Sequence, residues 1–162
     1  MMAQVIFKDA NQFGKLHDDA LTHFEDSHHL KLPEDYRAFL LKYNGGTPSP
    51  DIIDFVEDGR ETSSDINYLY RIHEGPYWAS LEYGLETFQG RIPEPFISIG
   101  YDAGGNQYLL GIQEPYRSKV YFWDHELESN EGEPPTFDNL SWVADSFTQW
   151  LEMLHEHPIS NL

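Results

Sequence analysis

The apolar residues of this chain change their spacing twice, and these changes limit the fold more than any other feature. Before residue 47 they recur every three or four positions, as on one face of a helix. Between residues 51 and 124 they cluster or alternate among β-branched and aromatic residues, as in strands. A helical spacing returns from Ser141 onward. This order predicts an α+β fold, with an antiparallel sheet packed against N-terminal helices and a C-terminal helix.

Two N-terminal helices are predicted. The first covers residues 11–29. Its apolar stripe contains Phe13, Leu16, Ala20, Leu21 and Phe24. The second begins at Pro33, because proline suits the first helical turn, and ends at Asn44-Gly45-Gly46, because asparagine and glycine tolerate a left-handed cap. Gly45 or Gly46 is therefore expected to adopt a backbone conformation that side chains resist.

The middle of the chain is predicted to form the sheet. The segments with strand-like patterns are DIIDFV, INYLYRI, FISIGY, NQYLLGI and KVYFWD. The polar segment EDGRETSSD is expected to be a loop that connects the first two of these strands. FISIGY and NQYLLGI are expected to form a hairpin, because the residues DAGG between them favour a turn.

Two more helices are predicted after the first strands. SLEYGLETF predicts a short helix that carries the chain across the sheet. SWVADSFTQWLEMLHEH predicts an amphipathic closing helix with Ser141 as its N-cap. Trp142 and Trp150 are expected on the apolar face of this helix, and Trp150 is expected in the core.

Composition limits the class of protein. The 162 residues are 40% hydrophobic, and no linker or repeat divides them, so we expect a single domain over residues 1–162. The chain contains no cysteine, which excludes disulfides, thiolate catalysis and cysteine-based zinc sites. The N-terminal sequence MMAQVIFKDANQF fits neither a signal peptide nor a membrane span. We therefore expect a cytoplasmic protein that does not contact a membrane.

The charge of the chain is strongly negative. Aspartate and glutamate total 28 residues against 10 lysines and arginines, so the formal net charge is -18. Such a field repels phosphate backbones, and direct binding of nucleic acid is not expected. The same field favours a basic protein partner and raises the rate of encounter with it.

Three motifs follow one another in a specific order: LPEDYRAFLLKYNGG, IPEPFISIGYDAGGNQYLLGI and KVYFWDHE, before a Trp-rich terminal segment. Together they resemble the SUKH superfamily, specifically its Smi/Knr-type branch, over about residues 10–156. The matching residues are Leu32, Pro33, Tyr36, Phe39, Leu40, Asn44, Gly45, Gly46, Ile99, Gly100, Gly104, Gly105, Asn106, Leu110 and Val120 to Glu126. Members often have aspartate where this chain has Asn106, so a charge is missing from that turn.

The resemblance implies a binding protein, without catalytic residues, metal or cofactor. Bacterial members are typically cytoplasmic immunity proteins that neutralise a cognate toxin domain, often a nuclease. Fungal relatives act as regulatory scaffolds, and this is the alternative function for the same fold. The net charge adds that the toxin domain is expected to be basic.

Asp124, His125 and Glu126 end an apolar strand abruptly and are the most conspicuous polar group. Consecutive side chains of a strand point to opposite faces, so the three converge only if the chain turns there. We favour the interpretation that Asp124 and His125 satisfy backbone groups where the strand leaves the sheet. A hydrolase that uses the carboxylates of Asp102, Asp124 and Glu126 is the remaining enzymatic alternative.

Contacts with a partner are expected from a turn, from acidic segments and from aromatic residues. Asp102 and Asn106 flank two glycines in the predicted hairpin turn. Exposed aromatic residues such as Tyr77, Trp78 and Tyr116 would support a binding face. The candidate partner-binding residues are Asp51, Asp54, Asp102, Asn106, Asp124, His125, Glu126, Glu128, Glu131 and Glu133.

Overall fold

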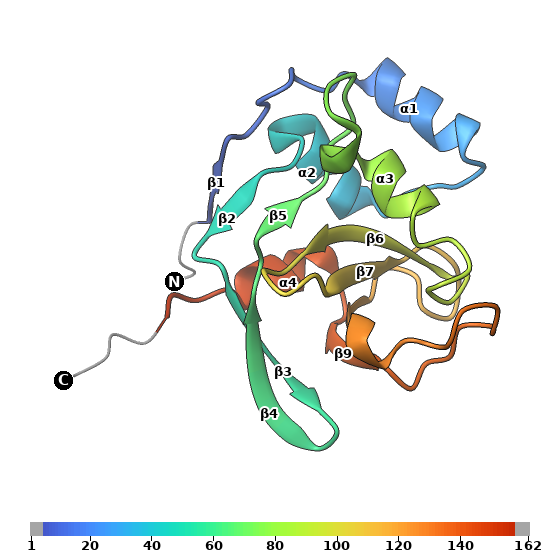
Figure 1. Ribbon diagram of the computed structural model, residues 1–162. Coiled ribbons are helices and arrows are strands. Elements are labelled where there is room, and N and C mark those ends of the chain that lie inside the picture. Colours follow the sequence, from blue (N-terminus) through green and yellow to red (C-terminus); the bar gives the residue numbers. More distant parts are fainter. Residues whose placement is uncertain (1–4, 158–162) are drawn as a thin grey trace.

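A five-stranded antiparallel sheet in the order β5-β6-β7-β8-β9 forms the centre of the protein (Figure 1). The computed structural model describes residues 5–157. Two-stranded sheets, β1-β2 and β3-β4, contact this sheet at β5 and at β9. The strands are β1 (Ile6–Lys8), β2 (Thr47–Ser49), β3 (Ile52–Glu57), β4 (Arg60–Asp65), β5 (Tyr68–Leu69), β6 (Phe96–Tyr101), β7 (Gln107–Gly111), β8 (Val120–Trp123) and β9 (Leu140–Ala144).

Helices and buried loops cover both faces of the central sheet, which confirms the predicted α+β fold. On one face the ring of Tyr108 lies 5.2 Å from that of Trp150, a fully buried core residue as predicted. On the other face Leu109 and Trp123 pack against Phe88 in a second core. The helices are α1 (Asp18–Ser27), α2 (Glu34–Tyr43), α3 (Leu81–Glu86) and α4 (Phe147–Glu152), with short 3-10 helices η1 (Tyr77–Ala79) and η2 (His125–Leu127).

The second predicted helix is confirmed as α2, including its cap. Pro33 is the N-cap, and Asn44 ends the helix in the left-handed conformation with φ 45°. Gly45 and Gly46 follow with φ values of 92° and 116°. A Cβ atom on Gly45 would overlap the side chain of Arg71, and one on Gly46 would overlap a backbone carbonyl. Both glycines therefore meet the predicted requirement.

The first predicted helix starts later than residue 11, so that boundary is wrong. The structure places the start of α1 at Asp18. Asn11 has φ 55° and Gly14 has φ 113°, and neither value is compatible with a right-handed helix. Phe13 lies in this irregular segment and is 36% exposed, so it does not belong to the helical stripe.

The segment EDGRETSSD was predicted as a loop, and this prediction is wrong. Its residues Arg60–Asp65 form β4, which pairs with β3 over the whole length of both strands. Asp58 and Gly59 make the turn, with φ values of 51° and 78°, as in the two-residue turns of tight hairpins. All side chains of β4 are polar, so the strand lacked the alternation on which the prediction depended. Figure 1 shows this hairpin projecting from the rest of the protein.

The closing helix is also shorter than predicted. Leu140–Ala144 form the strand β9, in which Trp142 pairs with Tyr121 of β8. Trp142 is 48% exposed rather than on a buried helical face. The N-cap of α4 is Ser146, not Ser141, and its hydroxyl accepts a hydrogen bond from the N–H of Gln149 at 3.0 Å. The pairing of β9 with β8 thus takes the place of the beginning of the predicted helix.

Other elements agree more closely with the sequence. SLEYGLETF contains α3, whose N-cap Ser80 accepts from the N–H of Tyr83 at 3.1 Å. The strand predicted at INYLYRI is reduced to Tyr68–Leu69. The predicted hairpin of β6 and β7 and the following strand β8 are confirmed. None of the helices within residues 5–157 combines the length and the apolar character needed to cross a bilayer.

Candidate partner-binding site

A polar cluster of Ser64, Asp102, Asn106 and His125 surrounds the turn between β6 and β7. The carboxylate of Asp102 is 4% exposed and accepts hydrogen bonds from the Ser64 hydroxyl at 2.7 Å and from the N–H of Gly104 at 3.0 Å. Asn106 donates to the same carboxylate twice, through its backbone N–H at 2.8 Å and its amide at 3.0 Å. Four donors fill the acceptor capacity of a carboxylate. Asp102 is therefore fully used inside the protein.

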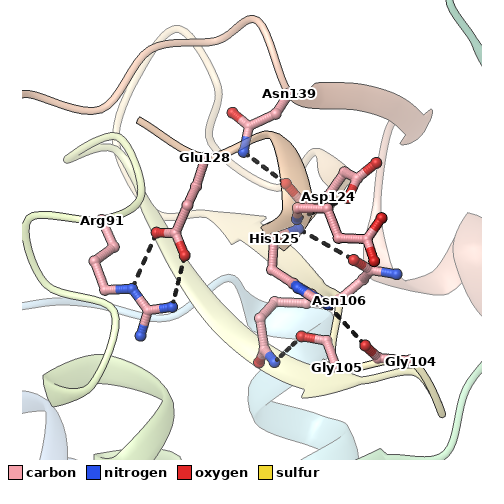
Figure 2. Close-up of polar contacts among 10 residues, drawn as sticks. Arg91, Gly104, Gly105, Asn106, Asp124, His125, Glu128 and Asn139 are labelled. Atoms are coloured by element: carbon pink, nitrogen blue, oxygen red, sulfur yellow. Dashed lines mark hydrogen bonds and ion pairs between the residues drawn. The ribbon is translucent and has the colours of Figure 1, made fainter. Parts of the chain in front are cut away.

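His125 joins the end of β8 to this turn, as Figure 2 shows. Its backbone N–H donates to the side-chain oxygen of Asn106 at 3.1 Å. Its ring Nε2 lies 2.8 Å from the carbonyl oxygen of Gly104. Since a carbonyl only accepts, Nε2 carries a proton and donates it in this contact. The imidazole is thereby fixed in orientation by the turn that it stabilises.

Asp124 and Glu126 have different surroundings from Asp102. The carboxylate of Asp124 accepts from the N–H of Glu126 at 3.0 Å, and its backbone carbonyl accepts from the amide of Asn139 at 2.9 Å (Figure 2). Glu126 is exposed. The predicted role of Asp124 and His125, to satisfy backbone groups where the strand ends, is confirmed. The three carboxylates of the hydrolase alternative thus have separate environments.

The acidic loop after η2 contributes one ordered ion pair. Glu128 accepts two hydrogen bonds from the guanidinium of Arg91, at 3.1 Å and 3.0 Å (Figure 2). These hydrogen bonds are the main cause that raises the pKa of Arg91. Glu131 and Glu133 are exposed farther along the same loop. Of the three glutamates predicted here, only Glu128 has an ordered contact with a cation among residues 5–157.

Asp51 and Asp54 lie at the beginning of the β3-β4 hairpin, apart from the acidic loop. Asp51 is half-buried, whereas Asp54 is exposed and pairs with His155 at 2.9 Å. The hydrogen bond that the ring of His155 donates to Asp54 raises the pKa of His155. Farther along β3, partial burial and then the charge of Asp124 raise the pKa of Glu57. Glu57 of this hairpin therefore lies close enough to Asp124 to feel its charge, which the sequence did not indicate.

An aromatic cleft of about 460 Å³ lies beside the polar cluster, within the range of about 300–1,000 Å³ that is typical of ligand sites. His125 and Glu128 line its edge, so two of the predicted residues border it. We define the cleft by its aromatic residues, which are Tyr70, Trp78, Tyr83, Phe88 and Tyr101. A larger hollow of about 610 Å³ near the end of α1 contains none of the predicted site residues.

Tyr70 forms the floor of the aromatic cleft. It is fully buried, and its ring centroid lies 5.8 Å from that of Tyr83 and 5.7 Å from that of Tyr101. Its hydroxyl donates to the side-chain oxygen of Gln107 at 2.8 Å. Burial raises the pKa of Tyr70, and the neighbouring phenols of Tyr83 and Tyr101 raise it further. The floor of the cleft therefore disfavours a negative charge.

Most residues of the cleft were not predicted as functional. Tyr77, Trp78 and Tyr116 were named as candidate exposed aromatic residues; Tyr77 and Trp78 are 50% and 55% exposed, and Tyr116 is half-buried. Tyr70, Tyr83 and Tyr101 come from three different segments, and only the fold places them side by side. The density of aromatic residues between Tyr68 and Phe88 was the one sequence signal that could have indicated Tyr70 and Tyr83, and it does not extend to Tyr101.

No group of histidine, aspartate and glutamate side chains within residues 5–157 is arranged to hold a metal ion.

The comparisons with known proteins show the family to which the chain belongs. The chain is similar to the SPbeta prophage-derived uncharacterized protein YokK of Bacillus subtilis (strain 168), with 25% identity over 174 residues, which cover 93% of this chain and 81% of that protein. Residues 15–153, from before α1 to the end of α4, match the model of the SMI1 / KNR4 family. The chain therefore belongs to the SMI1 / KNR4 family (SUKH-1).

Proposed function

We propose that this protein is a non-catalytic, cytoplasmic immunity protein that binds a cognate basic toxin domain and blocks it. The observation that carries the proposal is the contrast at the candidate site. The polar groups that resemble an active site bond to the protein's own backbone, while an aromatic cleft beside them opens to the surface. Aromatic residues in such a position are typical of the centres of protein interfaces.

Family membership and charge support the same proposal. The SUKH resemblance implies binding of a toxin domain, and the chain belongs to this family. The net charge of -18 favours a basic partner and a fast, salt-dependent encounter. Glu131 and Glu133, exposed next to the cleft-lining residue Glu128, would face such a partner.

The test is protection from a toxin. The product of the gene next to this one would be expressed in a bacterial host with and without this protein. We expect the neighbouring gene to encode a toxin, and co-expression to restore growth through a direct complex. A neighbouring protein that is harmless, or a toxin that still kills, would contradict the proposal. Capture of a host regulator in place of a toxin would support the scaffold alternative instead.

The proposed attraction between the acidic loop and a basic toxin domain can be tested with two matched pairs of charge reversals. The double change Glu131→Lys and Glu133→Lys and the double change Asp19→Lys and Asp26→Lys alter the net charge equally, and all four side chains are exposed. The first pair lies on the acidic loop and the second on α1. We expect the loop pair to slow association with the toxin more than the helix pair, and most at low salt. Equal rates would place the docking surface elsewhere.

A further inference from the structure

A row of aromatic rings runs through the cleft and continues beyond both of its ends. Its members, in spatial order, are Tyr68, Tyr101, Tyr70, Tyr83, Phe88 and Trp123, with neighbouring ring centroids 5.6–6.0 Å apart. Trp78 lies beside the first ring, 5.6 Å from Tyr68. The rings of Tyr68, Tyr70, Phe88 and Trp123 are buried, so the row is a connected aromatic cluster of which only Tyr83 and Tyr101 are partly accessible.

Cations of the protein itself lie over both ends of this row. The guanidinium of Arg91 is 4.9 Å from the centroid of Phe88 and 5.6 Å from that of Trp123. At the other end, the guanidinium of Arg71 is 5.3 Å from the centroid of Tyr68. All three distances are within the cation–π range of about 6 Å. The rings at both ends thus already hold guanidinium groups.

Three accessible rings line the cleft and have no such cation over them. Trp78 is exposed, and Tyr83 and Tyr101 are half-buried. Among residues 5–157, no lysine or arginine lies over these three rings. Indole is the best cation–π acceptor of the aromatic side chains, so the vacant position includes the strongest ring.

The charged side chains near these rings are Glu86, Glu128, Arg91 and the buried Arg71. Glu86 accepts a hydrogen bond from the hydroxyl of Tyr77 at 3.2 Å, and the ring of Tyr77 packs edge-on against Tyr83 at 5.6 Å. The positive charge of Arg91 is compensated by its two hydrogen bonds to Glu128. With a net charge of -18 on the whole chain, an anionic or phosphorylated ligand is disfavoured here.

We infer that the accessible rings of the cleft, those of Trp78, Tyr83 and Tyr101, receive one lysine or arginine side chain of the protein partner. The inference rests on the proposed function and adds the chemistry of the contact. The cationic group lies against Trp78 and Tyr101, and its methylene stem packs against Tyr83. This arrangement repeats, between two proteins, the contact that Arg91 makes within one.

The test uses small cations and needs no toxin, so its result is independent of the proposed function. Aromatic NMR signals of the full chain would be followed during titration with Nα-acetyl-arginine amide, Nα-acetyl-lysine amide and the uncharged Nα-acetyl-norleucine amide. We expect saturable shifts at Trp78 and Tyr101 with both cations, and an affinity at least about fivefold weaker for norleucine amide. Trp78→Ala should abolish the shift at Tyr101, and Trp78→Phe should retain part of it.

The matched control is Trp142→Ala. Trp142 is also exposed and its indole N–H donates to a carboxylate, that of Asp145 at 3.2 Å, but it does not line the cleft. We expect this variant to bind both cations as the unchanged protein does. Equal affinity for norleucine amide would overturn the inference in favour of an apolar pocket. Shifts at Trp142 as large as those at Trp78, or no shift in the cleft, would also overturn it.

Discussion

The polar cluster and the aromatic cleft lie next to each other, and they use their side chains in opposite ways. In the polar cluster, the Asp102 carboxylate is 4% exposed and its acceptor positions are filled by Ser64, Gly104 and Asn106. In the aromatic cleft, Trp78 is 55% exposed and has one ring neighbour, Tyr68. The first region is closed by its own hydrogen bonds, and the second leaves apolar and π surface accessible.

This difference shows which side chains remain available to a partner. A buried carboxylate with four hydrogen bonds has no acceptor left for a substrate or a metal. An exposed indole, in contrast, contributes little to the stability of the free protein. It can bury its apolar surface when a partner binds. We therefore infer that the polar cluster stabilises the fold and that the aromatic cleft binds the partner.

Within these two regions, the largest effect on stability is expected from Asp102→Ala. The change removes the carboxylate that accepts four hydrogen bonds, from Ser64, Gly104 and Asn106, which should lower the free energy of unfolding by about 3 kcal/mol. Chemical denaturation measures this value. Asp138→Ala removes an exposed carboxylate and is the control, with an expected change within about 0.5 kcal/mol. Equal stability of the two variants would contradict the stabilising role of Asp102 in the polar cluster.

A smaller loss is expected from His125→Ala. The change removes one side-chain hydrogen bond to the carbonyl of Gly104 and should cost about 1 kcal/mol. Glu126→Ala, next in the chain and exposed, should leave the unfolding midpoint unchanged. If His125→Ala were as stable as the unchanged protein while binding was lost, the histidine would belong to the binding region instead.

The pH dependence of stability tests whether the Tyr70 phenol is buried at the floor of the aromatic cleft. The folded protein raises the pKa of Tyr70 above its ordinary value of 10.0, mainly by burial. Its contribution is therefore complete below pH 10 and is lost as the pH rises toward the folded pKa. Tyr70→Phe should make the loss of stability above pH 10 shallower, by about 1.4 kcal/mol per pH unit. Urea unfolding at several alkaline pH values measures the slope, and identical slopes would contradict a buried phenol at the floor.

The smallest effect on stability is expected from Trp78→Ala. The indole is exposed, so its removal should change the free energy of unfolding by no more than about 0.5 kcal/mol. The measurement is the same denaturation series, with Trp150→Ala as the reference for a buried indole at about 3–5 kcal/mol. If Trp78→Ala lowered the free energy of unfolding as much as Trp150→Ala, the cleft would also be required for the stability of the fold.

The sequence predicted the elements whose side chains carry a clear pattern. In α2 the proline at the start, the apolar stripe and Asn44-Gly45-Gly46 at the end agree with one another, and the helix has these limits. β4 has only polar side chains and is held by backbone pairing with β3, which leaves no apolar period to detect. At β9, pairing of Trp142 with Tyr121 overrides a local pattern that also fits a helix.

The candidate site was predictable in part for the same reason. Asp124 and His125 stand out in the sequence, and the alternation of side chains along a strand indicated their structural role. The aromatic cleft depends on contacts between β5, α3 and β6, so Tyr70, Tyr83 and Tyr101 have no common signal along the chain. Among the aromatic residues of the cleft, only Trp78 was named from the sequence as a candidate for partner contact.

The most direct test of the account compares two exposed tryptophans. Isothermal titration calorimetry would measure the affinity of the toxin domain encoded beside this gene for the unchanged protein, Trp78→Ala and Trp142→Ala. We predict that Trp78→Ala weakens binding at least about tenfold, as at the centre of an interface, and that Trp142→Ala binds like the unchanged protein. Full affinity of Trp78→Ala, together with a loss in Trp142→Ala, would contradict the assignment of binding to the aromatic cleft.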